Sequence, residues 1–146
     1  LHTNDAPSSI TRLINIGIEP YLVSGAVNSV LAQRLVRRIC PDCADTVQVP
    51  PAAAEMLERY DLQADHLIEA SGCAQCRNGG HVGRVGIHEL LLLDDTTRDI
   101  IAANPPIAEF RKHCLQHGMV SLRHDALCKM VQGETTFEEV LRVTDD

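Results

Sequence analysis

The fold of this chain is organised around two cysteine pairs, Cys40-Pro41-Asp42-Cys43 and Cys73-Ala74-Gln75-Cys76. Each pair places two thiols on one tight turn, and 29 residues separate the two pairs. A structural zinc ion takes four nitrogen or sulfur ligands in a tetrahedron, and two C-x-x-C turns supply that set. Gly72 precedes the second pair and Gly79-Gly80 follows it, and glycine permits the positive φ angles that such turns need. The spacing therefore predicts a structural zinc site formed by the four cysteines.

Composition narrows the classes of function. The chain has 146 residues, enough for one or two small domains, and its formal net charge is −7. Nucleic-acid-binding proteins usually carry a basic surface, so this acidic balance argues against that class. No segment approaches the roughly 18 apolar residues of a membrane-spanning helix. Six cysteines without a secretory signal indicate a reducing compartment, and the start at Leu1 leads us to expect the C-terminal fragment of a longer protein.

Helical signals dominate the segment before the first cysteine pair. Asn4 or Asp5 is expected to cap a helix that Gly17 ends. Apolar side chains at helical spacing then follow in the segment Leu22–Leu31, which predicts a second helix. The β-branched residues of segment 33–39 allow a strand, but periodicity alone does not settle that segment.

Between the two pairs, Pro51 is expected to open a helix that runs to Tyr60 and packs on the metal site. After the second pair, Val85–Leu93 has the pattern of a strand. The run Leu90–Leu93 is apolar on both faces, so we expect it to be buried. The remainder is predicted to be helical, with Asp95 as the cap of its first helix and expected helices over 95–103, 107–117, 121–132 and 137–143.

Several polar residues outside the cysteine pairs are candidates for a role. Arg34, Arg37 and Arg38 form a basic cluster that suits either a solvated face beside the metal site or a site for an acidic partner or a phosphate. Arg84 and Glu89 are a candidate ion pair at the start of the strand after the second cysteine pair.

Histidines and the remaining cysteines are weaker candidates for metal binding. His81 and His88 are expected to form hydrogen bonds rather than to bind metal, because four thiols already complete a site. Cys114 and Cys128 are expected to be free cysteines in apolar surroundings. His117 follows Cys114 on one helix face, but two ligands do not make a metal site. The last helix should begin with a capping box, in which Thr136 and Glu139 satisfy each other's backbone N–H groups.

Four stretches carry a family resemblance: HTNDAPS at 2–8, LAQRLVRRICP at 31–41, GRVGIHELLLL at 83–93 and the C-terminal segment 121–144. Together they resemble the secretion ATPases of the type II secretion and type IV pilus superfamily. The resemblance implies an α/β, mainly α, fold: residues 1–39 would end a RecA-like ATPase core, 40–83 would form the four-cysteine insert, and 84–146 would form a strand with a helical subdomain. It also implies that His2 belongs to a histidine box that faces the γ-phosphate of ATP.

The same resemblance implies a function for the longer protein. It would be a cytoplasmic ATPase that uses ATP and Mg²⁺ to power protein secretion across the outer membrane, as a homohexamer bound to inner-membrane platform proteins. It would lie at the cytoplasmic face of the bacterial inner membrane, reaching the membrane only through its partners and binding no nucleic acid. This sequence contains neither a phosphate-binding Gly-x-x-x-x-Gly-Lys-Ser/Thr loop nor an acidic Walker B strand, so we expect it neither to bind nor to hydrolyse ATP alone.

Three alternatives stay open at the level of sequence. The residues GIHELL at 86–91, followed by Asp94 and Asp95, favour type II secretion over type IV pilus assembly, but they are few. Two C-x-x-C pairs also occur in zinc-ribbon modules that bind nucleic acid, which the acidic charge disfavours. A dithiol redox protein is the third alternative, and two pairs in one small chain favour a metal over it.

Overall fold

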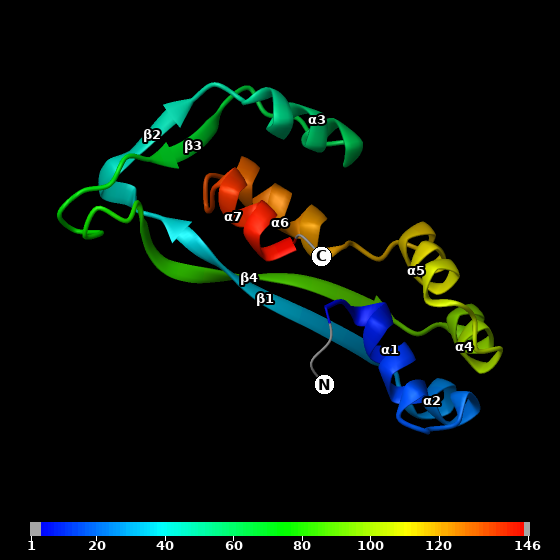
Figure 1. Ribbon diagram of the computed structural model, residues 1–146. Helices are drawn as coiled ribbons and strands as arrows, with labels where there is room; N and C mark the ends of the chain where they lie inside the picture. The colour runs from blue at the N-terminus through cyan, green and yellow to red at the C-terminus, as the bar shows by residue number, and fades with distance from the viewer. Residues whose placement is uncertain (1–3, 145–146) are drawn as a thin grey trace. The chain divides into compact units, whose positions relative to one another are not determined.

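The computed structural model describes residues 4–144, and these residues form a mixed α/β fold, as expected from the sequence. The elements follow one another in the order α1 (Ala6–Asn15), α2 (Pro20–Ala26), β1 (Ser29–Ile39), the 3-10 turn η1 (Pro41–Cys43), β2 (Ala44–Val47), α3 (Pro51–Arg59), β3 (Leu67–Ala70), β4 (His81–Leu92), α4 (Asp95–Ala102), α5 (Ile107–Gln116), α6 (Leu122–Val131) and α7 (Phe137–Thr144) (Figure 1). No helix in this described range is long and apolar enough to cross a membrane.

The strands form two separate two-stranded sheets. The longer sheet pairs β1 with β4. A backbone hydrogen bond lies at each end of this sheet: Leu93 N donates to Asn28 O (3.0 Å), and Cys40 N donates to Gly80 O (2.9 Å). Because the residue before β1 meets the residue after β4, the two strands run antiparallel. The shorter sheet is an antiparallel pair of β2 and β3, with Ala44 opposite Ala70 and Val47 opposite Leu67.

The chain divides into two compact units. The first unit contains the residues up to Gln33 together with His88–Leu122, and the second contains Arg34–Ile87 together with the residues from Arg123 onward. Both β1 and β4 therefore contribute residues to each unit. The metal-binding candidates Cys40, Cys43, Cys73 and Cys76 all belong to the second unit.

The first unit is a helical cluster with a small aliphatic core. Its helix α1 begins at the expected cap, where Ser8 N donates to Asp5 Oδ1 (2.7 Å), and it ends before Gly17, which has a φ of +98°. Helix α2 packs against α4, and α1 packs against α5. The buried side chains between these elements are mostly aliphatic, with one aromatic ring: Ala6, Ile10, Val23, Leu91, Leu93, Ile101, Phe110, Cys114 and Met119.

The structure corrects two expectations about the helices of the first unit. The helical spacing of Leu22–Leu31 does not produce one helix, because α2 ends at Ala26 and the chain joins β1 at Ser29. The cap of α4 is Asp94 rather than Asp95, since Thr97 N donates to Asp94 Oδ1 (2.8 Å).

The expected burial of the leucine run in β4 is only half right. Leu91 and Leu93 are buried, whereas Leu90 and Leu92 are 46% and 65% exposed. A strand sends successive side chains to opposite faces, and here one face of β4 packs on the core while the other is open.

The second unit combines the β2–β3 pair with helices α3, α6 and α7. Helix α3 begins at Pro51 as predicted, and it buries Ala53 and Leu57 on one side. The ring of Tyr60, at the end of α3, meets the ring of His124 from α6 edge-on at a centroid distance of 5.8 Å. This end of α3 therefore contacts α6, and the expected packing of the helix on the metal site stays a prediction.

Candidate metal centre

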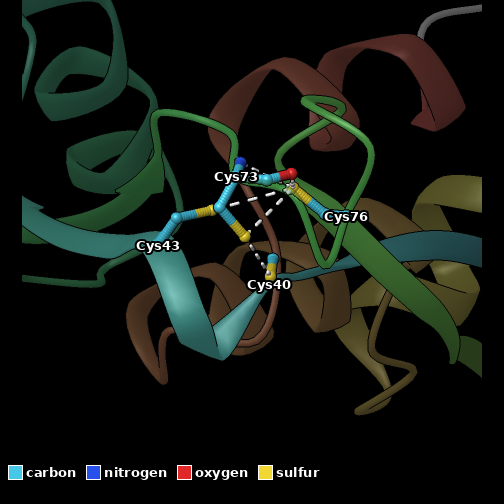
Figure 2. Close-up of side chains that lie close together, drawn as sticks. All are labelled: Cys40, Cys43, Cys73 and Cys76. Carbon is cyan, nitrogen blue, oxygen red and sulfur yellow. Dashed lines mark hydrogen bonds between the residues drawn. The ribbon is translucent and has the colours of Figure 1, made fainter.

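The four cysteines predicted as ligands meet at one point in the second unit (Figure 2). Their sulfur atoms all lie within 4.8 Å of one another. Three of the separations are 3.9 Å for Cys40–Cys73, 3.8 Å for Cys43–Cys76 and 3.7 Å for Cys73–Cys76. In the described part of the chain, this is the one cluster of histidine, cysteine or carboxylate side chains with metal-binding geometry.

These separations match a tetrahedral zinc site. With Zn–S bonds of about 2.3 Å, the sulfur atoms of a tetrahedron lie about 3.8 Å apart. A disulfide would instead need a sulfur–sulfur distance of about 2.05 Å, and all six cysteines are free. The donor set and its dimensions therefore fit a metal ion held by four thiolates.

The β2–β3 pair brings the two cysteine turns together. Cys43 directly precedes β2, and the pairing of Ala44 with Ala70 places it beside the segment that leads to Cys73. Ser71 N donates to Cys43 O at 3.2 Å, which continues the strand pairing up to the cluster. At the other side, the bond from Cys40 N to Gly80 O ties the first turn to the end of the second. Backbone hydrogen bonds thus hold together candidate ligands that are distant in sequence.

The second turn uses an unusual run of backbone angles. Asn78 N donates to Cys73 O at 2.8 Å, and Arg77 and Asn78 have positive φ angles of 52° and 61°. Gly72 has a φ of +91°, and a Cβ atom at that position would lie 2.8 Å from Asn78 O. Glycine is needed here because both the angle and the close approach exclude a side chain. The positive φ angle expected at Gly72 is therefore confirmed.

Two backbone N–H groups stabilise the thiolate form of Cys76. Cys76 Sγ accepts from Cys73 N at 3.1 Å and from Gly80 N at 3.2 Å. The bond from Cys73, together with that from Gly80, lowers the pKa of Cys76 to about 6. Burial has the opposite effect on the first turn, where it raises the pKa of Cys40 and raises that of Cys43 to about 12. Four thiolates in this space need a cation, and a divalent metal supplies one.

The other candidate site residues lie apart from the cysteine cluster. His2 falls outside the described residues. The Nδ1 atom of His81 lies 2.9 Å from Gly79 O, in line with the hydrogen-bonding role expected for that histidine. Cys114 is buried and Cys128 is half-buried, and neither belongs to a metal-binding cluster of the described range.

The predicted ion pair of Arg84 and Glu89 does not form. Both oxygens of Glu89 accept backbone N–H groups instead, from Ala6 at 2.7 Å and from Leu122 at 3.1 Å. The physical reason is strand geometry: residues five apart on one strand point to opposite faces and lie about 16 Å apart. Glu89 is only 3% exposed, and burial raises the pKa of its carboxyl group.

The sequence did not predict the cluster of charged side chains around Glu139. Glu139 was expected to complete a capping box, and Thr136 Oγ1 does accept from Glu139 N at 3.3 Å. The Glu139 carboxylate, however, turns to Arg37 and Arg142. The only sequence signals were an acidic residue at the third helical position and the arginines of segment 34–38, and neither identifies the other as its partner.

Comparisons with known proteins agree with the resemblance carried by the sequence motifs. A family model described as Type II/IV secretion system protein matches residues 1–142. A type II secretion system ATPase E of Vibrio cholerae is 41% identical over 146 residues, which cover 100% of this chain and 29% of that protein. A type IV pilus assembly ATPase PilB of Thermus thermophilus is 43% identical over 146 residues, covering 99% of this chain and 16% of that protein.

A type II secretion system protein E of Pseudomonas aeruginosa is 42% identical over 144 residues, which cover 99% of this chain and 28% of that protein. This chain thus spans less than a third of the length of each of these three relatives. The two secretion relatives and the pilus relative are 41–43% identical to this chain, so sequence identity does not distinguish the secretion branch from the pilus branch.

Proposed function

Because this chain belongs to the type II/IV secretion system protein family, we propose that it is part of an ATPase that powers protein secretion across the outer membrane through the type II machinery. The supporting observation is that the family match extends over residues 1–142, the cysteine cluster included. A relative named as a type II secretion system ATPase E matches the chain at 41% identity, and one named as a type II secretion system protein E matches it at 42%. The second candidate is a type IV pilus assembly ATPase, which the Thermus relative supports.

A genetic experiment separates the two candidates. Loss of the gene that encodes this chain should abolish the release of type II substrates into the medium and leave surface pili intact. Restoring the gene with Cys73→Ser should reproduce the defect, whereas restoring it with Cys128→Ser should rescue secretion. Loss of pili with normal secretion would instead establish the pilus assembly role.

The chemistry of ATP would belong to other parts of the whole protein. The sequence has no phosphate-binding loop, so ATP and Mg²⁺ would be bound elsewhere, and this chain alone would not hydrolyse ATP. Residues 1–39 would form the end of a RecA-like core, followed by the insert 40–83 and the helical segment 84–146. His2 would contribute from its histidine box toward the γ-phosphate. ATP turnover by the isolated chain above a buffer blank would contradict this assignment.

The four-cysteine cluster would hold a structural zinc ion, with Cys40, Cys43, Cys73 and Cys76 as its ligands. When bound, zinc would supply only cross-linking of the two turns, because four protein ligands leave no open coordination position. The matching sulfur distances and the two N–H groups on Cys76 support this role. Elemental analysis should find one zinc per chain, less than one in Cys73→Ser and one in Cys128→Ser. No zinc under reducing conditions would contradict the assignment.

The partners would be those of a secretion motor. We propose that neighbouring subunits of a homohexamer and inner-membrane platform proteins contact the zinc-bearing module at the cytoplasmic face of the bacterial inner membrane. Removal of zinc from the whole protein should then impair assembly and the ATPase activity that the platform stimulates. Unchanged assembly and activity would contradict this role of the module. The acidic charge leads us to expect no salt-dependent binding of DNA or RNA.

A further inference from the structure

We propose that Arg37, Arg84 and Arg142 form a binding pocket for a phosphate group. The three arginines, with Leu35, line a surface pocket of about 420 Å³ in the second unit. They come from three elements, since Arg37 lies on β1, Arg84 on β4 and Arg142 on α7. No function is assigned to this pocket by the secretion activity proposed above, and the inference does not depend on that activity.

A buried carboxylate fixes two of the three guanidinium groups. Glu139 Oε1 accepts from Arg37 Nε at 2.8 Å and from Arg142 Nε at 2.7 Å. Further contacts of 2.6 Å join Arg37 Nη2 to Oε1 and Arg142 Nη2 to Oε2. The Glu139 side chain is 0% exposed, whereas those of Arg37 and Arg142 are 45% and 53% exposed. The carboxylate therefore anchors both guanidinium groups from the inside while their outer edges face solvent.

Donors remain available on this outer side. A guanidinium has five N–H groups, and Arg37 and Arg142 each direct only Nε and Nη2 at Glu139. Within residues 4–144, no hydrogen bond or ion pair engages Arg84. Since two of the arginines are already held in place, a ligand would lose less side-chain entropy on binding than it would at flexible arginines.

The charge of the pocket favours a phosphate over a single carboxylate. Three guanidinium groups and the Glu139 carboxylate give a net charge of +2, which matches a phosphate dianion. A phosphate group presents three or more acceptor oxygens, and arginine binds such oxyanions through pairs of N–H groups. The volume lies within the range of small-ligand pockets, so it has room for the group to which a phosphate is esterified.

Only one arginine of the basic cluster at Arg34, Arg37 and Arg38 lines the pocket. Arg34 and Arg38 flank Arg37 but do not line the pocket. Arg34 donates instead to Val143 O, and Arg38 is separated from Arg37 by one position on a strand, which directs it to the other face. The site therefore takes only one arginine from the linear cluster and adds two from distant parts of the chain.

The test is a titration of the ¹⁵N-labelled chain with inorganic phosphate at neutral pH and constant ionic strength. The Nε resonances of Arg37, Arg84 and Arg142 should shift together with one saturable affinity, and that of Arg38 should stay. Arg84→Gln should weaken phosphate binding by about tenfold, because it removes one charged hydrogen-bonding partner and leaves the Glu139 contacts intact. The matched control is Arg38→Gln, which removes the same charge from outside the pocket and should leave the affinity unchanged.

Two further arms identify the source of the phosphate group. sn-Glycerol 3-phosphate binding more tightly than inorganic phosphate would assign the pocket to an esterified phosphate such as a lipid headgroup, and equal binding would assign it to the free ion. Shifts that do not saturate would overturn the proposal, as would equal weakening by Arg84→Gln and Arg38→Gln. Acetate binding as tightly as phosphate would overturn it as well, in favour of an acidic side chain.

Discussion

Arg37 and Glu139 lie 102 residues apart in the chain and bind each other through both side chain and backbone. Arg37 N donates to Glu139 Oε2 at 2.9 Å, while its guanidinium donates to Oε1. The carbonyl of Arg37 accepts from Thr135 Oγ1 at 2.8 Å, and Ile39 N donates to Glu134 O at 3.0 Å. Residues 134–139 thus satisfy polar groups of β1 that its pairing with β4 leaves open, and they cover an edge that would otherwise be exposed.

Replacing Glu139 by glutamine should destabilise the second unit by about 2–3 kcal/mol. The amide keeps the shape of the side chain, but its NH₂ group would face guanidinium N–H donors and would leave the Arg37 N–H without an acceptor. The half-exposed arginines can regain water, which keeps the loss below that of a fully buried pair. Urea unfolding in the presence of zinc measures the change. Glu138→Gln is the control, since Glu138 is an exposed neighbour on α7, and it should stay within about 0.5 kcal/mol of the native chain.

Protonation of Glu139, which breaks its ion pairs with Arg37 and Arg142, should lower the stability of the chain in acid. The Arg142 and Arg37 side chains hold the pKa of Glu139 far below its usual range. A carboxyl whose folded-state pKa is lowered stabilises the fold above its unfolded pKa of about 4.3, and this contribution is lost as the pH falls further. The difference in unfolding free energy between native and Glu139→Gln chains should therefore be constant above about pH 5 and shrink below it. A difference that grew in acid would contradict the pairing. Loss of zinc in acid affects both chains alike and cancels in the comparison.

Local signals in the sequence were sufficient for the cysteine cluster and for most helix ends. A C-x-x-C turn is a local motif, and two of them favour a shared ion, so the four cysteines that cluster could be named as candidate ligands before any coordinates. Asp5 as a cap and Gly17 as a terminator are equally local, because each acts on the backbone within four residues. These predictions depend only on residues close in sequence.

Features that depend on distant partners were missed. Segment 27–31 has helical spacing of apolar residues, yet Ser29–Ile39 is a strand because it pairs with β4, which lies much further along the chain at His81–Leu92. Likewise, the third position of α7 suggested a capping box, while the arginines that bind Glu139 could not be inferred from spacing. Arg84 and Glu89 looked like neighbours in sequence, but their strand separates them. Only the first of these features is a case in which pairing between strands overrides local periodicity.

Glu89 provides a prediction for the first unit. Its carboxylate accepts from the first N–H group of two helices, those of Ala6 and Leu122, which have no partner within their own helices. Glu89→Ala should cost about 2–4 kcal/mol, because both buried donors would lose their acceptor. Urea unfolding should show the loss, and hydrogen exchange should show faster exchange at Ala6 and Leu122. Glu109→Ala, at an exposed position of α5, should change neither measurement. Unchanged exchange at Ala6 in Glu89→Ala would contradict the contact.

The glycine before the second cysteine turn offers the sharpest test of the metal centre. A Cβ atom at Gly72 would lie 2.8 Å from Asn78 O, and the φ of +91° is itself unfavourable for alanine. Gly72→Ala should therefore displace the turn that carries Cys73 and lower zinc affinity by at least about tenfold, since a shift of a few tenths of an ångström spoils tetrahedral geometry. Competition with a coloured zinc chelator measures the affinity.

Gly83→Ala is the matched control for this substitution. Gly83 has a similar φ of +72°, but a Cβ atom there would have no neighbour within 4 Å. Both variants bear the cost of a left-handed alanine, about 1 kcal/mol in unfolding free energy, so that any difference in zinc affinity arises from the clash at Asn78. Equal zinc affinity in the two variants would show that the close approach of Gly72 to Asn78 does not determine the geometry of the metal centre.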